Sequence, residues 1–232
     1  AARLRERGLD VEPAANVIVD LFGTSGDERA LSGFEPAIAL LPGSRENAYE
    51  DGRFLLHVVG ELAREFPSLG AALSVAPGLD AARFAGDARA DGWEVASGPQ
   101  AALPFELRRD DRTVVRAWRG SLGGVLARAT LVMGQAGTAN EAAAAAGIPV
   151  AAFERGLDRK TAWYRKRQSG LLGDALAIFP GDERAVAGVG DLLRDDARRA
   201  HMGAIGRARM GAPGGARRIA EYIAALASGD RA

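Results

Sequence analysis

The turn Pro42-Gly43-Ser44-Arg45 contains the residue types that hold an anion. Glycine lets the backbone approach a ligand closely, a serine hydroxyl can donate a hydrogen bond, and the planar arginine fork matches a phosphate. The same four residues also suit an ordinary connection between a strand and a helix, with the arginine at the surface. The tetrapeptide alone is consistent with either interpretation.

A second turn runs from Gly134 to Glu141 and reads Gly-Gln-Ala-Gly-Thr-Ala-Asn-Glu. If a helix starts inside it, the first N–H groups attract anions, and the small residues leave room for a diphosphate. Glu141, one turn into that helix, could accept hydrogen bonds from the two hydroxyls of a ribose. Alternatively, Thr138 caps the helix and Glu141 is its capping-box partner.

The spacing of the glycines separates these turns from two common nucleotide motifs. It fits neither G-x-x-x-x-G-K-[ST] nor G-x-G-x-x-G, so a mononucleotide kinase or an NAD enzyme is not favoured. Each turn follows a short apolar run. Because ligands of open α/β sheets bind outside the carboxyl ends of the strands, two such turns in one sheet indicate a ligand site.

The composition excludes several other classes of function. The chain has 232 residues, 30 basic and 30 acidic side chains, no cysteine and two histidines, His57 and His201. We therefore expect no disulfide, no thiolate nucleophile, no metal centre and no nucleic acid partner. No acidic D-x-D pair lies near the two turns, so the chemistry requires no metal, and we expect no cofactor beyond a bound substrate. No long apolar run predicts a transmembrane helix, and no signal peptide is visible.

Short apolar runs alternate with amphipathic segments along the chain. Strands are predicted at 37–41, 72–76, 93–96, 112–116, 130–133, 149–153 and 175–179. Helices are predicted at 49–66, 120–128, 140–146, 160–168, 183–193 and 215–227, and residues 98–111 are predicted as an exposed loop or hairpin. Residues 17–19 suit a short strand or an extended linker. This alternation predicts an α/β fold, a Rossmann-like parallel sheet with helices on both faces.

Four segments carry a family resemblance. Two are specific: Leu40-Leu41-Pro42-Gly43-Ser44-Arg45, and Gly134 to Ala142 followed by Gly147-Ile148-Pro149-Val150. Two are softer: Ala15 to Asp20, and Arg209 to Ala216. Together they resemble the lipid-A-disaccharide-synthase-related glycosyltransferases of the GT-B type. That family writes its signatures as A-S-G-T-A-x-x-E and G-x-P-x-V, and its interdomain crossover as G-[HN]-P-x-x-D.

The resemblance implies the donor-binding half of a two-domain glycosyltransferase, which transfers a sugar from a UDP-sugar to an acceptor that is lipid-linked in this family. Residues 36–232 would form the nucleotide-sugar-binding domain, and residues 1–35 the end of an N-terminal domain with the crossover. The residues implied to contact the donor diphosphate are Gly43, Ser44, Arg45, Gly137 and Thr138. Glu141 would hold the ribose. Arg116 and Trp118 would lie near the uracil, where Trp118 either stacks on the base or belongs to the core.

The sequence departs from the family pattern at several positions. Gln135-Ala136 replaces the usual Ala-Ser, and Ala15 and Val17 replace the glycine and proline of the crossover. The family's catalytic acid/base lies in the N-terminal domain, which the resemblance places before this chain. No catalytic residue is therefore assigned, and His57 is interpreted as structural.

The segment Arg155 to Arg167 joins basic residues with Trp163 and Tyr164; the basic ones are Arg155, Arg159, Lys160, Arg165, Lys166 and Arg167. It is either a solvated helix face or a patch for an anionic membrane surface or an acceptor phosphate. The expected location is cytoplasmic, and the second interpretation adds the inner face of the membrane. Two other functions stay open: a UDP-N-acetylglucosamine 2-epimerase, which shares the fold, and a non-catalytic sugar-nucleotide-binding domain.

Overall fold

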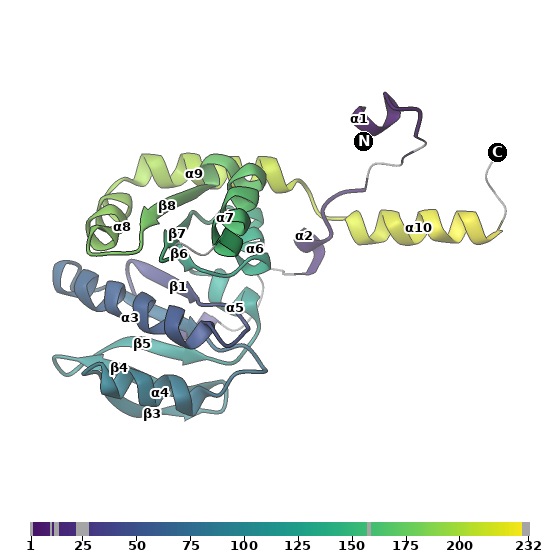
Figure 1. The fold of residues 1–232 in the computed structure, drawn as a ribbon. Coiled ribbons are helices and arrows are strands. Elements are labelled where there is room, and N and C mark those ends of the chain that lie inside the picture. The colour runs from purple at the N-terminus through teal and green to yellow at the C-terminus, as the bar shows by residue number, and fades with distance from the viewer. Residues whose placement is uncertain (1, 10, 12–13, 22–27, 157–158, 229–232) are drawn as a thin grey trace.

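Eight strands form one sheet in the computed structural model, which describes residues 2–9, 11, 14–21, 28–156 and 159–228 (Figure 1). The strands are β1 Ala37–Leu41, β2 Gly70–Ser74, β3 Glu94–Gln100, β4 Leu103–Arg109, β5 Arg112–Trp118, β6 Leu131–Gly134, β7 Val150–Glu154 and β8 Leu176–Pro180. Their order is β3-β4-β5-β2-β1-β6-β7-β8, and only β4 runs against its neighbours. The carboxyl ends of the six parallel strands from β5 to β8 therefore share one edge.

Both faces of the central strands are buried, which explains their continuous apolar sequences. All five residues of β1 and all four of β6 are buried. Ile38 and Leu40 point into one core, whereas Ala37, Ala39 and Leu41 point into the other. The predicted Rossmann-like α/β fold is confirmed, and the seven predicted strands occur within a few residues of their predicted bounds.

The segment predicted as an exposed loop or hairpin contains an additional strand, β4. It pairs with β3 on one side and β5 on the other, both in antiparallel register. Asp110 and Asp111 join β4 to β5 with φ values of 52° and 59°. Two consecutive residues with positive φ fit the tight hairpin turn that matches the twist of the strands.

Helices cover both faces of the sheet. They are α1 Ala2–Arg5, α2 Ile18–Leu21, α3 Ala48–Glu65, α4 Ala81–Ala90, α5 Leu122–Leu126, α6 Thr138–Ala146, α7 Arg159–Leu172, α8 Arg184–Arg194, α9 Asp196–Met210 and α10 Gly215–Ser228, with single 3₁₀ turns at Glu28–Ala30 and Gly173–Ala175. Helices α3, α4 and α8 pack on one face, whereas α5 and α6 pack on the other. Helices α4 and α9 were not predicted, and residues 17–19 belong mostly to α2 instead of a strand or linker.

The segment before β1 packs with the sheet. Ala30 and Leu31 are fully buried in the same core as Ala37 and Leu41. Residues 28–35 are thus part of this body, while the division into domains at residue 35 stays a prediction.

The N-terminal segment and the last helix meet away from the sheet. The Asp20 carboxylate accepts hydrogen bonds from the backbone N–H groups of Gly214 at 2.5 Å and Ala216 at 2.7 Å, at the start of α10. A side chain on Gly215 would lie 2.3 Å from the carbonyl oxygen of Ala15. The two softer segments of the family resemblance are therefore in direct contact.

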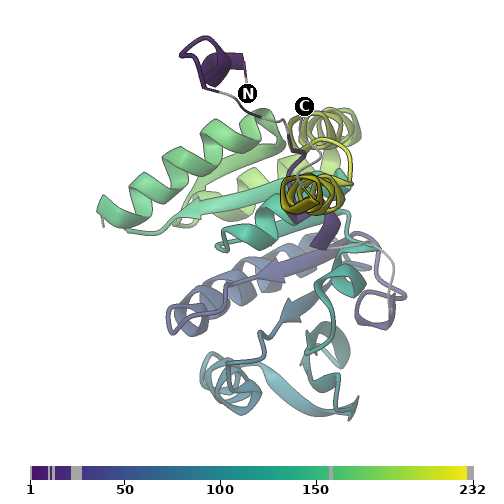
Figure 2. The ribbon, with the colours of Figure 1, turned by 90° about the vertical axis from the view of Figure 1, so that its right-hand side faces the viewer.

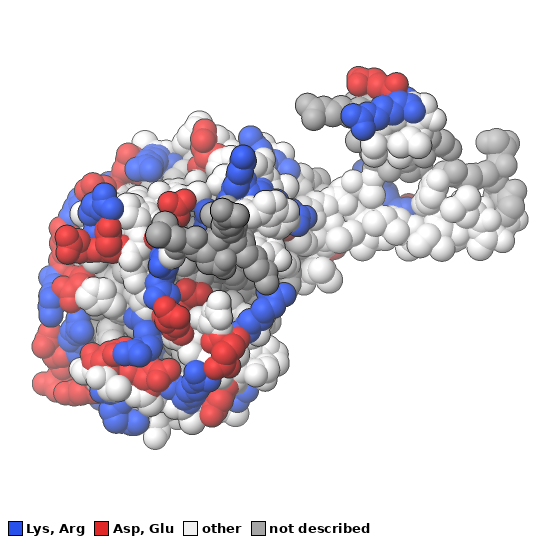
Figure 3. All heavy atoms as spheres, viewed as in Figure 1, with Lys and Arg blue, Asp and Glu red and all other residues white. Residues whose placement is uncertain are grey.

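Helix α10 points away from the body (Figures 1 and 2). In the space-filling view most of the visible surface of this arm is uncharged, whereas acidic and basic side chains alternate over this side of the body (Figure 3). The charged residues of α10 are Arg217, Arg218 and Glu221. Ile219, Ile223 and Leu226 form an exposed apolar stripe along it. None of the helices in the described ranges is both long enough and apolar enough to cross a membrane.

Candidate functional site

The two turns singled out by the sequence lie side by side. Leu41 at the end of β1 is in register with Gly134 at the end of β6. The carbonyl oxygen of Leu41 accepts hydrogen bonds from the backbone N–H groups of Gln135 at 3.0 Å and Ala136 at 3.2 Å. The structure thus joins both turns at the carboxyl edge of the sheet, although their role with a ligand stays a prediction.

The turn after β1 presents its side chains to solvent. Gly43 has a φ of +115°, and a Cβ there would have no atom within 4 Å. Ser44 and Arg45 are exposed, and neither side chain forms a hydrogen bond or ion pair with any other described residue. The carbonyl oxygen of Arg45 accepts a hydrogen bond from the Ala48 N–H, which starts α3. The backbone of this turn is anchored, while its polar side chains are free for a ligand.

The turn after β6 presents backbone N–H groups. Gly137 is the N-cap of α6 and Thr138 its first helical residue, without a side-chain cap. The alternative capping box of Thr138 and Glu141 is therefore wrong. The N–H groups of Gly137, Thr138 and Ala139 donate to no acceptor within the part of the chain that the structure describes. They stand at the positive end of the helix dipole.

Glu141 lies one turn into α6 and is half-buried. Burial raises the pKa of its carboxyl, and attraction to Arg167 opposes that shift. No hydrogen bond to this carboxylate occurs among the described residues. It is thus available as an acceptor close to the free N–H groups.

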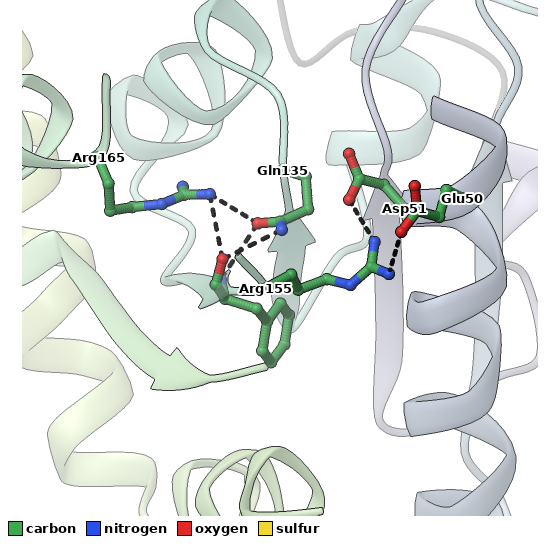
Figure 4. Close-up of polar contacts among 6 residues, drawn as sticks. Glu50, Asp51, Gln135, Arg155 and Arg165 are labelled. Carbon is green, nitrogen blue, oxygen red and sulfur yellow. Dashed lines mark hydrogen bonds and ion pairs between the residues drawn. The ribbon is translucent and has the colours of Figure 1, made fainter. Parts of the chain in front are cut away.

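A network of buried polar side chains supports the turn after β6 from beneath (Figure 4). The Gln135 side chain donates to the Phe153 carbonyl and accepts from the Phe153 N–H, both at 3.1 Å. Gln168 donates to the carbonyl oxygens of Ala136 at 3.2 Å and Gly137 at 3.1 Å. Arg165 donates to Gln135 at 2.7 Å and to Gln168 at 3.0 Å. Gln135, one of the departures from the family pattern, is a structural residue here.

A charged cluster continues this network toward α3. Arg155 donates to Asp51 at 2.6 Å and lies 3.1 Å from Glu50 (Figure 4). Burial raises the pKa of the Asp51 carboxyl, although its hydrogen bond to Arg155 lowers it. The cluster joins the end of β7 to the first turn of α3.

The two residues expected near the base are already held by the protein. Trp118 is 2% exposed, and its indole N–H donates to the Ser121 carbonyl at 2.8 Å. Trp118 is a core residue, and its ring is not free to stack on a base. Arg116 stacks over Phe34 and donates to the carbonyl oxygens of Arg29 and Ser32.

The structure leaves part of the basic segment exposed and buries another part, while the choice between its two predicted interpretations stays open. Helix α7 buries Arg165 and Gln168 against the turn after β6, while Trp163 and Tyr164 are 57% and 52% exposed. The segment is therefore only partly a surface patch. The side chains of Arg159 and Lys160 lie outside the described residues.

A groove of about 530 Å³ runs beside α3. It is lined by Arg53, His57, Asp91 and Arg109, and also by Glu50 and Arg155 of the charged cluster. Arg53 is already paired with Asp91 at 2.5 Å, and Arg109 stacks on Trp93. His57 faces this groove and not the two turns. No group of three metal-ligating side chains occurs within the described ranges.

Comparison with known proteins finds solved structures with a similar fold. No protein-family model and no curated protein matches the chain. A solved structure of a putative UDP-N-acetylglucosamine 2-epimerase from Listeria monocytogenes is similar, with a TM-score of 0.63 and 15% identity over 93% of this chain and 53% of that one. The spinosyn rhamnosyltransferase SpnG complexed with thymidine diphosphate aligns with a TM-score of 0.46 and 16% identity, over 80% of this chain and 45% of that one.

At such identities the similarity to the Listeria structure shows the fold alone, the Rossmann-like arrangement found in GT-B proteins. The chain spans about half the length of these two structures. Neither of them is a lipid-A-disaccharide synthase, so that finer assignment stays a prediction.

Proposed function

We propose that this chain is the sugar-nucleotide-binding half of a GT-B-type glycosyltransferase that resembles lipid-A-disaccharide synthase and takes a UDP-sugar as donor. One observation carries the proposal: the two turns are joined through Leu41 at the carboxyl edge of the sheet. Free side-chain donors from one turn and free N–H groups from the other can then hold a single anionic group.

The donor diphosphate would lie between the two turns. Arg45 supplies a planar fork for two phosphate oxygens, with Ser44 beside it. The N–H groups at Gly137 and Thr138 add the positive end of the α6 dipole. Glu141, one turn along α6, would accept hydrogen bonds from the ribose hydroxyls.

The chemistry of the proposal is displacement at the anomeric carbon. An acceptor hydroxyl attacks that carbon, the bond to the diphosphate oxygen breaks, and UDP leaves with the negative charge. Arg45 and the mouth of α6 stabilise this growing charge. The proton of the acceptor passes to a base that this chain does not assign, and the proposal includes no metal or other cofactor.

A lipid-linked acceptor at an anionic membrane surface is the remaining part of the proposal. Trp163, Tyr164, Lys166 and Arg167 are exposed along α7. Aromatic and basic side chains together suit a lipid headgroup region, which supports this choice of acceptor.

Calorimetry with UDP tests the donor site. We expect the parent protein to bind UDP and Arg45→Ala to weaken binding about tenfold or more, because a charge-assisted hydrogen bond to phosphate is lost. Arg64→Ala is the matched control, since Arg64 is an exposed arginine at the opposite end of α3. A folded parent protein that does not bind UDP would contradict the proposal.

The ribose contact has its own measurement. Parent protein should prefer UDP over 2′-deoxy-UDP, and Glu141→Ala should lose that preference because the acceptor for the ribose hydroxyls is gone. An unchanged preference in Glu141→Ala removes Glu141 from the site without removing the diphosphate contacts.

An isomerase is the second candidate, supported by the similarity to the putative 2-epimerase structure. Epimerisation needs no acceptor, so incubation of the protein with UDP-N-acetylglucosamine alone separates the two reactions. UDP binding without turnover in either assay favours a non-catalytic sugar-nucleotide-binding domain.

A further inference from the structure

Among the described residues, Arg165 is a buried cation without a carboxylate partner. The side chain lies on α7 and is 7% exposed. Its guanidinium donates to neutral oxygens only: Gln135 Oε1 at 2.7 Å, Gln168 Oε1 at 3.0 Å and the Phe153 carbonyl at 3.5 Å. The Nε atom is buried and has no acceptor among the described residues.

The nearest acidic groups compensate this charge only from a distance. Asp51 and Glu154 attract Arg165 through space, but neither forms an ion pair with it. The Asp51 carboxylate is bonded to Arg155 instead. Because arginine remains charged in proteins, a cation paired only with neutral dipoles keeps part of its desolvation cost.

The same network orients the peptide groups at the mouth of α6. Gln168 Nε2 holds the carbonyl oxygens of Ala136 and Gly137. In a planar trans peptide the N–H points opposite to the C=O. Gln168 therefore turns the N–H groups of Gly137 and Thr138 away from α7, and these are the N–H groups without an acceptor in the described chain.

We propose that Arg165 and Gln168 are positioning residues for an anion at the mouth of α6, and that a diphosphate bound there supplies the countercharge that Arg165 lacks. This inference rests on the proposed function for the identity of the ligand. Gln168 sets the direction of the N–H donors, while Arg165 holds Gln168 and adds a positive potential beneath the bound anion.

The proposal predicts that some variants lose affinity for the ligand while the ligand-free protein stays folded. Arg165→Met removes the charge, yet Gln135 Oε1 keeps the Phe153 N–H and Gln168 Oε1 keeps the Asn140 side-chain amide. Gln135→Glu keeps the oxygen that accepts from the Phe153 N–H and gives Arg165 a carboxylate partner, but it loses the Nε2 donor to the Phe153 carbonyl. If the ligand normally supplies the countercharge, the carboxylate of Gln135→Glu competes with the anion.

The experiment measures two quantities for each variant: calorimetric affinity for UDP and for inorganic pyrophosphate, and the free energy of unfolding in urea without ligand. We expect both affinities to fall about tenfold in Arg165→Met and in Gln135→Glu. Gln135→Glu should remain folded, because its ion pair with Arg165 offsets part of the cost of the lost donor to Phe153 and of repulsion from Asp51. Arg165→Lys should retain most of the affinity. Arg89→Met, which removes an exposed charge on α4, should change both affinities less than twofold.

The outcomes distinguish this inference from the proposed function. Pyrophosphate binding that depends on Arg165, without UDP binding, supports the anion role and contradicts the nucleotide function. A stable Gln135→Glu protein with unchanged affinity overturns the inference, even if the parent protein binds UDP. Binding of neither probe by the folded parent protein overturns both.

Discussion

The turns after β1 and β6 lie side by side but are built in opposite ways. In the first, Ser44 and Arg45 point into solvent, and a positive-φ glycine shapes the backbone. In the second, the exposed groups are backbone N–H groups, and the carbonyl oxygens behind them are held by Gln168. One turn offers mobile side chains and the other offers a fixed backbone.

This difference assigns a different task to each turn. A fixed set of N–H donors loses no side-chain entropy when an anion binds, whereas an arginine on a flexible stem must be ordered. A substitution that displaces the packed backbone of the second turn, such as one at Gly134, should therefore affect stability and binding together. Substitutions of the free side chains in the first turn should affect binding alone.

The largest expected change in stability comes from a substitution at Gly134 in the second turn. A Cβ on Gly134 would lie 1.8 Å from Asn140 Oδ1, and Asn140 is fully buried and donates to the Gly134 carbonyl and to Gln168. We expect Gly134→Ala to lower the free energy of unfolding by about 3 kcal/mol, since it both overpacks the site and breaks buried hydrogen bonds. Urea unfolding measures this change.

Gly137→Ala is the matched control in the same turn. A Cβ there would meet no atom within 4 Å, and the φ of −86° suits alanine. Its stability should stay within about 1 kcal/mol of the parent protein. Equal losses in Gly134→Ala and Gly137→Ala would contradict the idea that Asn140 locks this turn.

A smaller effect is expected in the first turn. Gly43→Ala has open space for its Cβ, so its cost comes from the φ of +115° alone. We expect a loss of roughly 1–2 kcal/mol in urea unfolding. Gly78→Ala, in the loop after β2 with equally open space and no positive φ, should cost less. A neutral Gly43→Ala would show that this turn adapts and is not held in its observed conformation.

The smallest effect concerns pH. The pKa of Asp51, beside the second turn, is raised by burial, so the folded protein binds a proton more readily than the unfolded chain. The free energy of unfolding should therefore fall as the pH rises from about 3.8, the ordinary pKa of this carboxyl, through its higher pKa in the folded protein. Asp51→Asn should remove this slope in urea titrations at a series of pH values.

The carboxyl of Asp20 has a pKa shifted in the opposite direction to that of Asp51. Hydrogen bonds from the Ala216 and Gly214 backbones lower its pKa, so its contribution is present above its ordinary pKa and is lost as pH falls through the folded value. Asp20→Asn should thus change the pH profile in the opposite direction to Asp51→Asn. Profiles of the same sign would show that one of the two carboxyls is not in the environment described.

The elements that position the site could be predicted from apolar pattern alone. The runs at 37–41 and 131–134 are buried on both faces, so each reads as a strand without interruption. Their adjacency was not predictable residue by residue, because parallel pairing joins segments that lie far apart in the sequence.

Two of the longer helices, α4 and α9, were not predicted because few large apolar residues form their buried faces. Helix α4 buries Phe84 between Ala81 and Ala88. Helix α9 turns Gly203 and Gly206 toward α6, where a Cβ would lie 2.3 Å from the Gly147 carbonyl and 2.4 Å from the Ala144 carbonyl. Close backbone packing through glycine leaves no periodic apolar signal.

The polar support of the second turn was also missed. Arg165 and Gln168 stand among exposed basic residues, and composition does not show which of them are buried. Because Arg165 and Gln168 are three residues apart, they lie on the same helix face. The unusual Gln135 indicated that a polar side chain elsewhere in the chain contacts this turn. Trp118 is the opposite case, a residue that was predicted as a possible ligand contact and is buried in the core. An aromatic residue at the end of a strand is equally typical of both roles.

The contact between Asp20 and the start of α10 has a topological consequence. Positions 20 and 214 are separated by 194 residues, yet they are joined by a hydrogen bond, and Gly215 touches Ala15. The contact closes the intervening chain into one large loop, whose two ends meet at Asp20 and Gly214. The contact therefore joins the two terminal segments through hydrogen bonds that are separate from the backbone ladder of the sheet.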